Sequence, residues 1–121
     1  MVKRILTVDD SQTMRDMVAF TLRKAGFDVN VAEDGTKALI ALSGGRFDLI
    51  ITDLNMPNMD GISLIKNVRA DSRHRAVPIL ILTTESDEVK KAAGKKAGAT
   101  GWLVKPFSPE RLIELVHRVC P

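Results

Sequence analysis

The sequence predicts an α/β fold, a doubly wound, five-stranded parallel sheet with five helices covering its two faces. Short apolar runs alternate five times along the chain with stretches whose apolar residues recur at helical spacing. Residues 47–52 and 77–82 are almost continuously apolar, as in strands that are buried on both faces. Five such strand–helix units suit the strand order 2-1-3-4-5, in which helices pack on both sides of the sheet.

The first unit pairs a short strand with a regular amphipathic helix. Residues 2–8 form the expected strand, which ends at Asp9. The apolar face of the helix that follows consists of Met14, Met17, Val18, Thr21, Leu22 and Ala25. Gly26 ends this helix, because glycine readily adopts the backbone conformation found at helix C-termini.

The second and third units are recognised by changes in the spacing of apolar residues. Residues 27–32 alternate apolar and polar side chains, which is typical of an edge strand. Residues 35–42 predict a short helix that Gly44 and Gly45 close. After the strand at 47–52, the apolar face of the third helix consists of Ile62, Leu64, Ile65 and Val68.

The fourth helix, expected near residues 87–97 after the strand at 77–82, is the least well specified. Its predicted apolar face consists of Val89, Ala92, Ala93 and Ala97. These side chains bury little area, and Gly94 in the middle costs roughly 1 kcal/mol relative to alanine. We therefore predict that this helix is the most mobile in the fold.

The last unit has clear start signals. Residues 102–104 form a short strand, and Ser108 followed by Pro109 is a typical beginning of a helix. The apolar stripe of this helix consists of Leu112, Leu115, Val116 and Val119. We expect residues 1–121 to form one domain, with no effector domain after Pro121.

The composition is that of an ordinary globular protein, with 45% hydrophobic and 27% charged residues among 121. The apolar runs are much shorter than the ~20 residues that span a bilayer, and the N-terminus lacks a signal-peptide pattern. The lone Cys120 cannot form an internal disulfide, which favours a cytoplasmic location. The net charge of +3 fits a mildly basic surface, which we favour over attraction of nucleic acid or of an acidic protein. His74 and His117 are expected at the surface.

Polar residues follow four of the predicted strands. Asp9 and Asp10 follow the first strand, Asp53 the third, Thr83 the fourth and Lys105 the fifth. Because the carboxyl ends of parallel strands meet at one edge of the sheet, these side chains should lie together. Three neighbouring carboxylates repel one another unless a cation lies among them. Their hard oxygen atoms suit Mg²⁺, so the sequence predicts a magnesium site.

The same residues suit phosphoryl transfer. A carboxylate such as Asp53 can act as a nucleophile and form an aspartyl phosphate. The reaction needs positioning and charge neutralisation, which a cation and Lys105 can supply. The hydroxyl of Thr83 can bond another phosphoryl oxygen. Taken singly, each residue also has a structural explanation, since Asp10 could cap a helix and Asp53 could begin a turn. Their shared position at strand ends favours a site.

Five motifs occur in order along the chain. They are Val-Asp-Asp-Ser at 8–11, Asp-Leu-Asn-Met-Pro-Asn-Met-Asp-Gly at 53–61, Leu-Thr-Thr-Glu at 82–85, Gly-Ala-Thr-Gly-Trp at 98–102 and Lys-Pro-Phe at 105–107. In these motifs the sequence resembles the response-regulator receiver domains, specifically the single-domain chemotaxis regulators of the CheY type. The resemblance covers the whole chain and implies a flavodoxin-like fold.

The resemblance also implies the roles of the site residues. Asp53 would be the phosphoacceptor. Mg²⁺ would be bound by Asp10, Asp53 and the backbone carbonyl of Asn55, with Asp9 contributing through a water molecule.

Three further residues would respond to the phosphoryl group. Lys105 would contact it, and Thr83 would move towards it with the following loop. Trp102 would be the rotating aromatic switch, and the Lys105–Pro106 bond would be cis. This family usually has Tyr or Phe at the aromatic position. An indole is bulkier and its N–H needs a partner when buried, so a plain packing role for Trp102 is the alternative.

The implied function is that of a two-component chemotaxis response regulator. It would take a phosphoryl group from a histidine kinase, bind a partner such as the flagellar motor switch, and dephosphorylate itself quickly, as Asn55 and Glu85 suggest. The output face would comprise the fourth helix, fifth strand and fifth helix. Its charged and aromatic residues are Lys90, Lys91, Lys95, Lys96, Trp102, Arg111 and Arg118. This face would suit an acidic and apolar segment of the partner.

Two alternative functions share the phosphoacceptor chemistry. The first is a phosphate sink or phosphorelay intermediate that does not bind the motor. The second is a phosphatase of the haloacid dehalogenase type, which needs a general acid two residues after the nucleophile. Asn55 stands at that position and cannot donate a proton as a carboxylic acid can, so we expect no enzyme activity beyond the domain's own phosphorylation and dephosphorylation.

Overall fold

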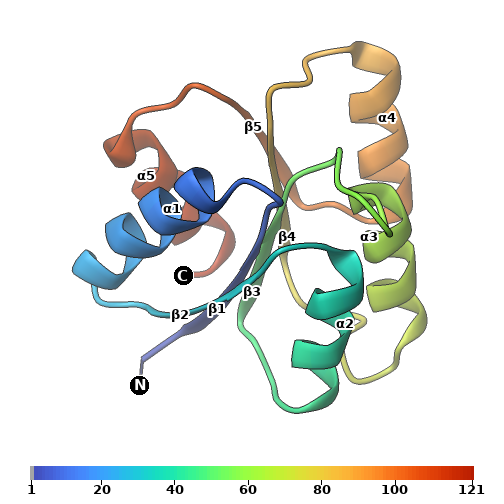
Figure 1. The fold of residues 1–121 in the computed structure, drawn as a ribbon, viewed down its shortest axis with the longest axis horizontal. Helices are drawn as coiled ribbons and strands as arrows, with labels where there is room; N and C mark the ends of the chain where they lie inside the picture. Colours follow the sequence, from blue (N-terminus) through green and yellow to red (C-terminus); the bar gives the residue numbers. More distant parts are fainter. Residues whose placement is uncertain (1) are drawn as a thin grey trace.

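The computed structural model describes residues 2–121, which form a single parallel sheet flanked by helices (Figure 1). The strands are β1 (Arg4–Val8), β2 (Asp28–Ala32), β3 (Leu49–Thr52), β4 (Ile79–Thr83) and β5 (Gly101–Val104). They are ordered β2-β1-β3-β4-β5, and all four pairings are parallel. The predicted fold class and strand order are confirmed, and residues 28–32 form an edge strand as expected.

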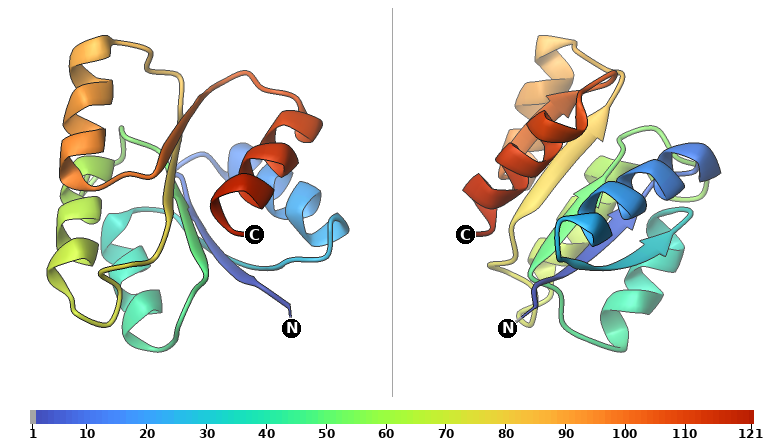
Figure 2. Two further views of the ribbon diagram at one scale, coloured as in Figure 1. Left: turned by 180° about the vertical axis from the view of Figure 1, so that it is seen from behind. Right: turned by 90° about the vertical axis from the view of Figure 1, so that its left-hand side faces the viewer.

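Five helices form the outer layers. They are α1 (Gln12–Lys24), α2 (Gly35–Ser43), α3 (Gly61–Ala70), α4 (Glu88–Ala97) and α5 (Pro109–Val119). α1 and α5 lie on one face of the sheet, and α2, α3 and α4 lie on the other (Figures 1 and 2). Two apolar clusters, one on each face, bury the inward side chains of the strands. None of the helices in residues 2–121 is long and apolar enough to cross a membrane.

Each helix begins at a residue whose side chain accepts a hydrogen bond from the backbone of the first turn. These N-cap residues are Ser11, Asp34, Asp60, Asp87 and Ser108. Such caps satisfy N–H groups that have no partner within the helix. Ser108 with Pro109 starts α5 as predicted.

The packing of α4 differs from the prediction. Val89 is 77% exposed, and Ala92 and Ala93 are also exposed, so the predicted apolar face is not the packed one. The buried residue of α4 is Gly94, which lies against Ile81 of β4. Small residues at helical spacing do not specify which side faces the sheet, because none of them gains much by burial. The predicted mobility of α4 stays a prediction.

The position of His74 also differs from the prediction. His117 is exposed as expected, but His74 is 5% exposed, and its Nε2 lies 3.2 Å from the carbonyl oxygen of Leu42 at the end of α2. The segment that carries His74 is held by Arg69, whose guanidinium donates to the carbonyls of His74, Arg75 and Val77. Because the contact between His74 and Leu42 joins residues 32 positions apart, spacing alone did not reveal the burial.

Candidate metal and phosphoryl site

The polar residues predicted to share a site do lie together at the carboxyl edge of the sheet. Val8 pairs with Thr52, so Asp9 and Asp53 leave neighbouring strands at the same level. Thr83 pairs with Val104, which brings Lys105 beside the end of β4. The register of the parallel strands therefore assembles the site from residues far apart in the chain.

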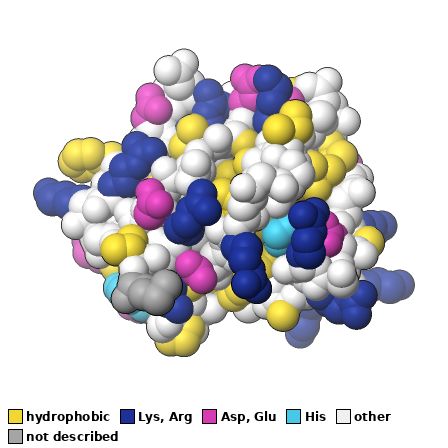
Figure 3. Space-filling view, turned by 90° about the horizontal axis from the view of Figure 1, so that it is seen from below, with side chains coloured by type: hydrophobic (Ala, Val, Ile, Leu, Met, Phe, Trp, Pro, Cys, Tyr) yellow, Lys and Arg dark blue, Asp and Glu magenta, His cyan; other side chains and the backbone are white. Residues whose placement is uncertain are grey.

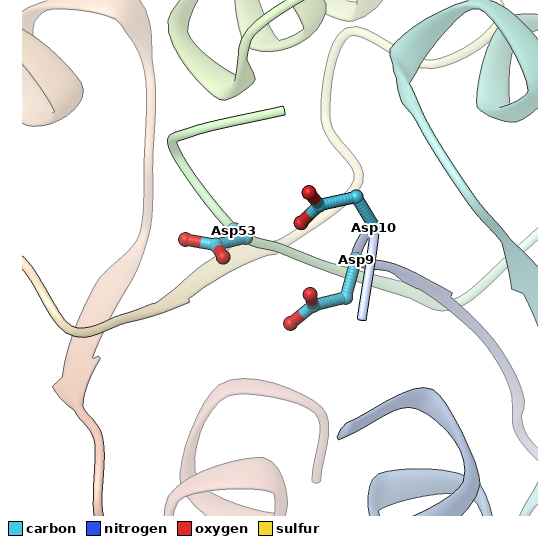
Figure 4. A group of neighbouring side chains, drawn as sticks. All are labelled: Asp9, Asp10 and Asp53. Carbon is cyan, nitrogen blue, oxygen red and sulfur yellow. The ribbon is translucent and has the colours of Figure 1, made fainter. Parts of the chain in front are cut away.

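Three carboxyl groups form the centre of this site. Asp9, Asp10 and Asp53 each offer a carboxylate oxygen, and these atoms lie within 4.8 Å of one another. Figure 4 shows the three side chains projecting into one region at the strand ends. Asp9 is buried, Asp53 is partly buried and Asp10 is exposed. The cluster thus has a solvent-facing side through Asp10.

Lys105 compensates part of this negative charge. Its Nζ donates to Asp9 Oδ2 at 2.7 Å and to Asp53 Oδ2 at 3.3 Å. The Lys105 side chain is 9% exposed, so the ammonium group is largely removed from water. Three ionised carboxylates and one ammonium leave an excess negative charge. This excess favours a bound cation.

The hydrogen bonds of the three carboxylates show which oxygens are free. Asp9 Oδ1 accepts from the Ser11 N–H at 3.0 Å, and Asp53 Oδ1 accepts from the Leu54 N–H at 2.7 Å. Among residues 2–121, the Asp10 side chain has no hydrogen-bond or ion-pair partner. Free carboxylate oxygens beside partly occupied ones form the hard donor set that Mg²⁺ prefers, together with water. The residues present therefore fit this ion.

The loop between β3 and α3 is held close to the site. A Cβ at Gly61 would overlap the carbonyl oxygen of Asp53, so only glycine allows α3 to start there. Asp34, the N-cap of α2, accepts from Asn58 Nδ2 at 2.9 Å and so anchors the loop. Its hydrogen bonds from the Lys37 N–H and from Asn58 lower the pKa of this carboxyl. Asn55 lies exposed in this loop.

The anchoring role of Asp34 was not predicted from the sequence. No spacing pattern links it to Asn58.

A chain of hydrogen bonds joins Thr83 to Trp102. The fully buried Thr83 accepts, through Oγ1, a hydrogen bond from the Glu85 N–H at 3.3 Å. The carbonyl oxygen of Glu85 in turn accepts from Trp102 Nε1 at 3.1 Å. The expected need of the indole N–H for a partner is confirmed. The β4–α4 loop is thereby connected both to the site and to β5.

The predicted cis bond between Lys105 and Pro106 is confirmed.

A groove lies between α4 and β5. It is lined by Glu88, Lys91, Ala92, Lys95, Ala99, Thr100, Gly101 and Trp102. Lys95 makes no ion pair with any residue in 2–121, and Lys91 lies 4.0 Å from Glu88. At the opposite end of the sheet, Lys and Arg outnumber acidic side chains on the visible face (Figure 3). The acidic site is therefore set in a basic molecule.

Comparison with known proteins identifies the family. The model of the response regulator receiver domain matches residues 5–117. The chain belongs to this family. This receiver domain is 44% identical over 119 residues to the chemotaxis protein CheY of Pseudomonas aeruginosa, with 96% of this chain and 94% of that protein covered.

Solved structures agree with this assignment. The structure of chemotaxis protein CheY4 of Vibrio cholerae superposes with a TM-score of 0.95 at 50% identity, covering 98% of this chain and 99% of that one. The receiver domain of sensor histidine kinase PA1611 of Pseudomonas aeruginosa has a TM-score of 0.91 at 29% identity, covering 99% and 98%. That structure has a magnesium ion coordinated in its active-site cleft.

The comparisons define the class of function. The chain is a two-component response-regulator receiver domain closely related to CheY chemotaxis regulators, and receiver domains are signalling proteins. A domain of this kind takes its phosphoryl group from a histidine kinase and acts on a downstream protein.

Proposed function

We propose that this receiver domain accepts a phosphoryl group on Asp53, and that Asp10, Asp53 and the backbone carbonyl of Asn55 bind Mg²⁺, with Asp9 acting through a water molecule. The observation that carries the proposal is the buried Lys105 ammonium between Asp9 and Asp53, beside the free carboxylate of Asp10. The lysine contacts two of the three carboxylates and leaves the third without a partner among residues 2–121, which favours a site for a cation and a phosphoryl group over a closed ion-pair network.

The geometry supports the following transfer step. One carboxylate oxygen of Asp53 attacks the phosphorus of the donor, a P–O bond forms, and the bond between phosphorus and the donor breaks. The Leu54 N–H holds Asp53 Oδ1 and so fixes the orientation of the carboxylate. Lys105, which contacts Asp53 Oδ2, is within reach of an oxygen on the incoming group. Bound Mg²⁺ supplies positive charge that offsets repulsion between the carboxylate and the phosphoryl oxygens.

Thr83 links the phosphoryl group to the rest of the domain. Its hydroxyl now accepts from the Glu85 N–H. If the Thr83 side chain rotates so that its hydroxyl donates to a phosphoryl oxygen, Oγ1 moves away from the Glu85 N–H and the β4–α4 loop is released. Because the Glu85 carbonyl also holds the Trp102 indole, this change reaches β5. Thr83 and Trp102 therefore form the switch.

The output face comprises α4, β5 and α5. Lys91, Lys95 and Trp102 line one groove there, which combines positive charge with apolar surface. We propose that phosphorylation allows this groove to bind an acidic, partly apolar segment of the flagellar motor switch. A phosphate-sink or phosphorelay role would use the same Asp53 chemistry without this binding step. The protein acts in the cytoplasm in either case.

Charge reversal tests the output face. The variant Lys91→Glu/Lys95→Glu should lose binding to an acidic motor-switch peptide in the phosphorylated state, whereas Lys66→Glu on α3 serves as the control. Unchanged binding by the double variant would exclude this face. Absence of binding by the phosphorylated wild type would favour the sink or phosphorelay role.

Intact mass measurement tests the phosphoacceptor role. The protein is mixed with Mg²⁺ and acetyl phosphate, after which the donor is removed and the mass is followed over time. We expect uptake of one phosphoryl group by the wild type, rapid loss through autodephosphorylation, and no uptake by Asp53→Asn. Equal uptake by Asp53→Asn would contradict the proposal. A long-lived phosphoryl group would contradict the expected rapid decay.

A further inference from the structure

The indole of Trp102 lies against the one residue of α4 that has no side chain. A Cβ at Gly94 would be 3.1 Å from Cζ3 and 3.6 Å from Cε3 of Trp102. Both atoms belong to the benzo ring of the indole, which is attached to Cβ through the five-membered ring, so a phenylalanine ring does not place atoms at the same positions. We propose that Gly94 is a positioning residue for Trp102, and that the indole seated on it holds α4 to the sheet.

Gly94 is placed where α4 approaches the sheet most closely. It is the buried residue of this helix, and its missing Cβ would also lie 2.8 Å from Cδ1 of Ile81. Real Cβ atoms hardly ever approach other atoms so closely, so Ala at this position would displace a neighbour. Glycine costs helix stability here, and the close approach of Trp102 and Ile81 accounts for its presence.

The indole is fixed at a second point by its N–H group. Trp102 Nε1 donates to the carbonyl oxygen of Glu85, which precedes the start of α4. The ring therefore contacts the middle of α4 through Gly94 and the loop before α4 through Glu85. A tyrosine or phenylalanine ring would lack the edge that meets Gly94 and the ring N–H.

Apart from its packing on α3, α4 has few apolar side chains that could replace this contact. Val89, Ala92 and Ala93 are exposed, and Ala97 is only partly buried. Trp102 itself packs against the apolar cluster on this face of the sheet. The attachment of α4 near its middle thus depends on Trp102 and Ile81. This dependence needs no phosphoryl group and is separate from the proposed function.

A mutant cycle in the unphosphorylated protein tests the proposal. The variants are Gly94→Ala, Trp102→Phe and their combination. Ile81→Val and Gly94→Ala/Ile81→Val test the alternative that Ile81, and not Trp102, limits the space at Gly94. Ala93→Gly measures the general Ala/Gly difference at an exposed position of α4. The readouts are the urea midpoint of unfolding and, in variants that retain it, the emission of Trp102, the single tryptophan of the chain.

We expect Gly94→Ala to change the urea midpoint in opposite directions in the wild-type and Trp102→Phe backgrounds. It should lower the midpoint in the wild-type background, where the ring blocks the methyl group. It should raise the midpoint in the Trp102→Phe background, where alanine acts as the better helix former, because Cδ1 lies at the flexible end of the Ile81 side chain and can move aside. Gly94→Ala should also shift the Trp102 emission to longer wavelength and increase its quenching by acrylamide, because the ring is displaced towards water.

Three results would overturn the proposal. The first is an equal change of midpoint in both backgrounds with unchanged emission. The second is rescue of Gly94→Ala by Ile81→Val but not by Trp102→Phe, which would assign the clearance to Ile81. The third is that Gly94→Ala fails to fold and that adding Trp102→Phe does not restore folding. In that case the added methyl group does not clash with the Trp102 ring.

Discussion

The Nζ of Lys105 lies 2.7 Å from Oδ2 of Asp9, and both side chains are less than a tenth exposed. The two residues are 96 positions apart in the chain. Breaking a buried ion pair by removing one partner is costly, because the remaining charge stays out of water. This contact therefore links the stability of the domain to the charge balance of its site.

Lys105→Met should lower the free energy of unfolding by about 3 kcal/mol, because Asp9 and Asp53 lose their shared cation. Added Mg²⁺ should restore part of this loss, since an ion that binds only the folded state stabilises it. Urea unfolding with and without Mg²⁺ measures both effects, and the exposed Lys66→Met is the control. A variant as stable as the wild type would show that the pair contributes nothing.

Asp10→Asn should weaken Mg²⁺ binding at least about tenfold, which is about 1.4 kcal/mol, because Asp10 has the carboxylate with no partner among residues 2–121. Titration calorimetry measures the affinity directly. Asp16→Asn on the exposed side of α1 should leave it unchanged. Equal affinities of Asp10→Asn and wild type would exclude Asp10 as a ligand.

Thr83→Val should separate phosphorylation from its structural effect. The variant keeps the shape of the side chain but removes the acceptor of the Glu85 N–H, at a cost of about 1 kcal/mol. Uptake of a phosphoryl group by mass should persist, whereas the change in Trp102 emission on phosphorylation should disappear. An emission change as large as that of the wild type would mean that the signal bypasses Thr83.

Gly98 and Gly26 provide a matched pair with positive φ angles, +120° and +99°. A Cβ at Gly26 meets nothing within 4 Å, whereas a Cβ at Gly98 would lie 2.8 Å from Nε of Arg69. Gly26→Ala should cost about 1 kcal/mol through backbone strain, and Gly98→Ala should cost more, about 2 kcal/mol or above. Urea unfolding of both variants checks this order, and equal costs would contradict it.

The ion pair of Asp71 with Arg73 predicts an acid-dependent contribution to stability. Hydrogen bonds from Arg73 lower the pKa of Asp71 from 3.8 to about 2. A lowered carboxyl pKa gives stability that is fully present above the unfolded pKa and is lost as the pH falls through the folded pKa. The difference in thermal midpoint between wild type and Arg73→Gln should therefore shrink from pH 4 towards pH 2. A constant difference would exclude this pair as its source.

The sequence allowed prediction of the fold and most of the site for one physical reason. The site residues directly follow strands or, like Thr83, end them, so predicting parallel strands in the order 2-1-3-4-5 was enough to bring Asp9, Asp10, Asp53 and Lys105 together. Their chemical types then indicated a cation and a phosphoryl group.

Features that depend on contacts between distant segments were not predictable in this way. The burial of His74 depends on the end of α2, and the role of Asp34 depends on a loop 24 residues away. Gly94 looked like a defect in a weak helix because its neighbours Ile81 and Trp102 belong to other elements. In each case local spacing carried no information about the partner.

Chemical mapping of the phosphorylated residue tests the central claim most directly. After loading with acetyl phosphate and Mg²⁺, borohydride reduction converts a phosphoaspartate to homoserine, which peptide mass spectrometry locates in the chain. We predict homoserine at position 53 alone, and none when Mg²⁺ is chelated before loading. Homoserine at Asp9 or Asp10, or none at position 53 in the loaded protein, would contradict the assignment of Asp53 as phosphoacceptor.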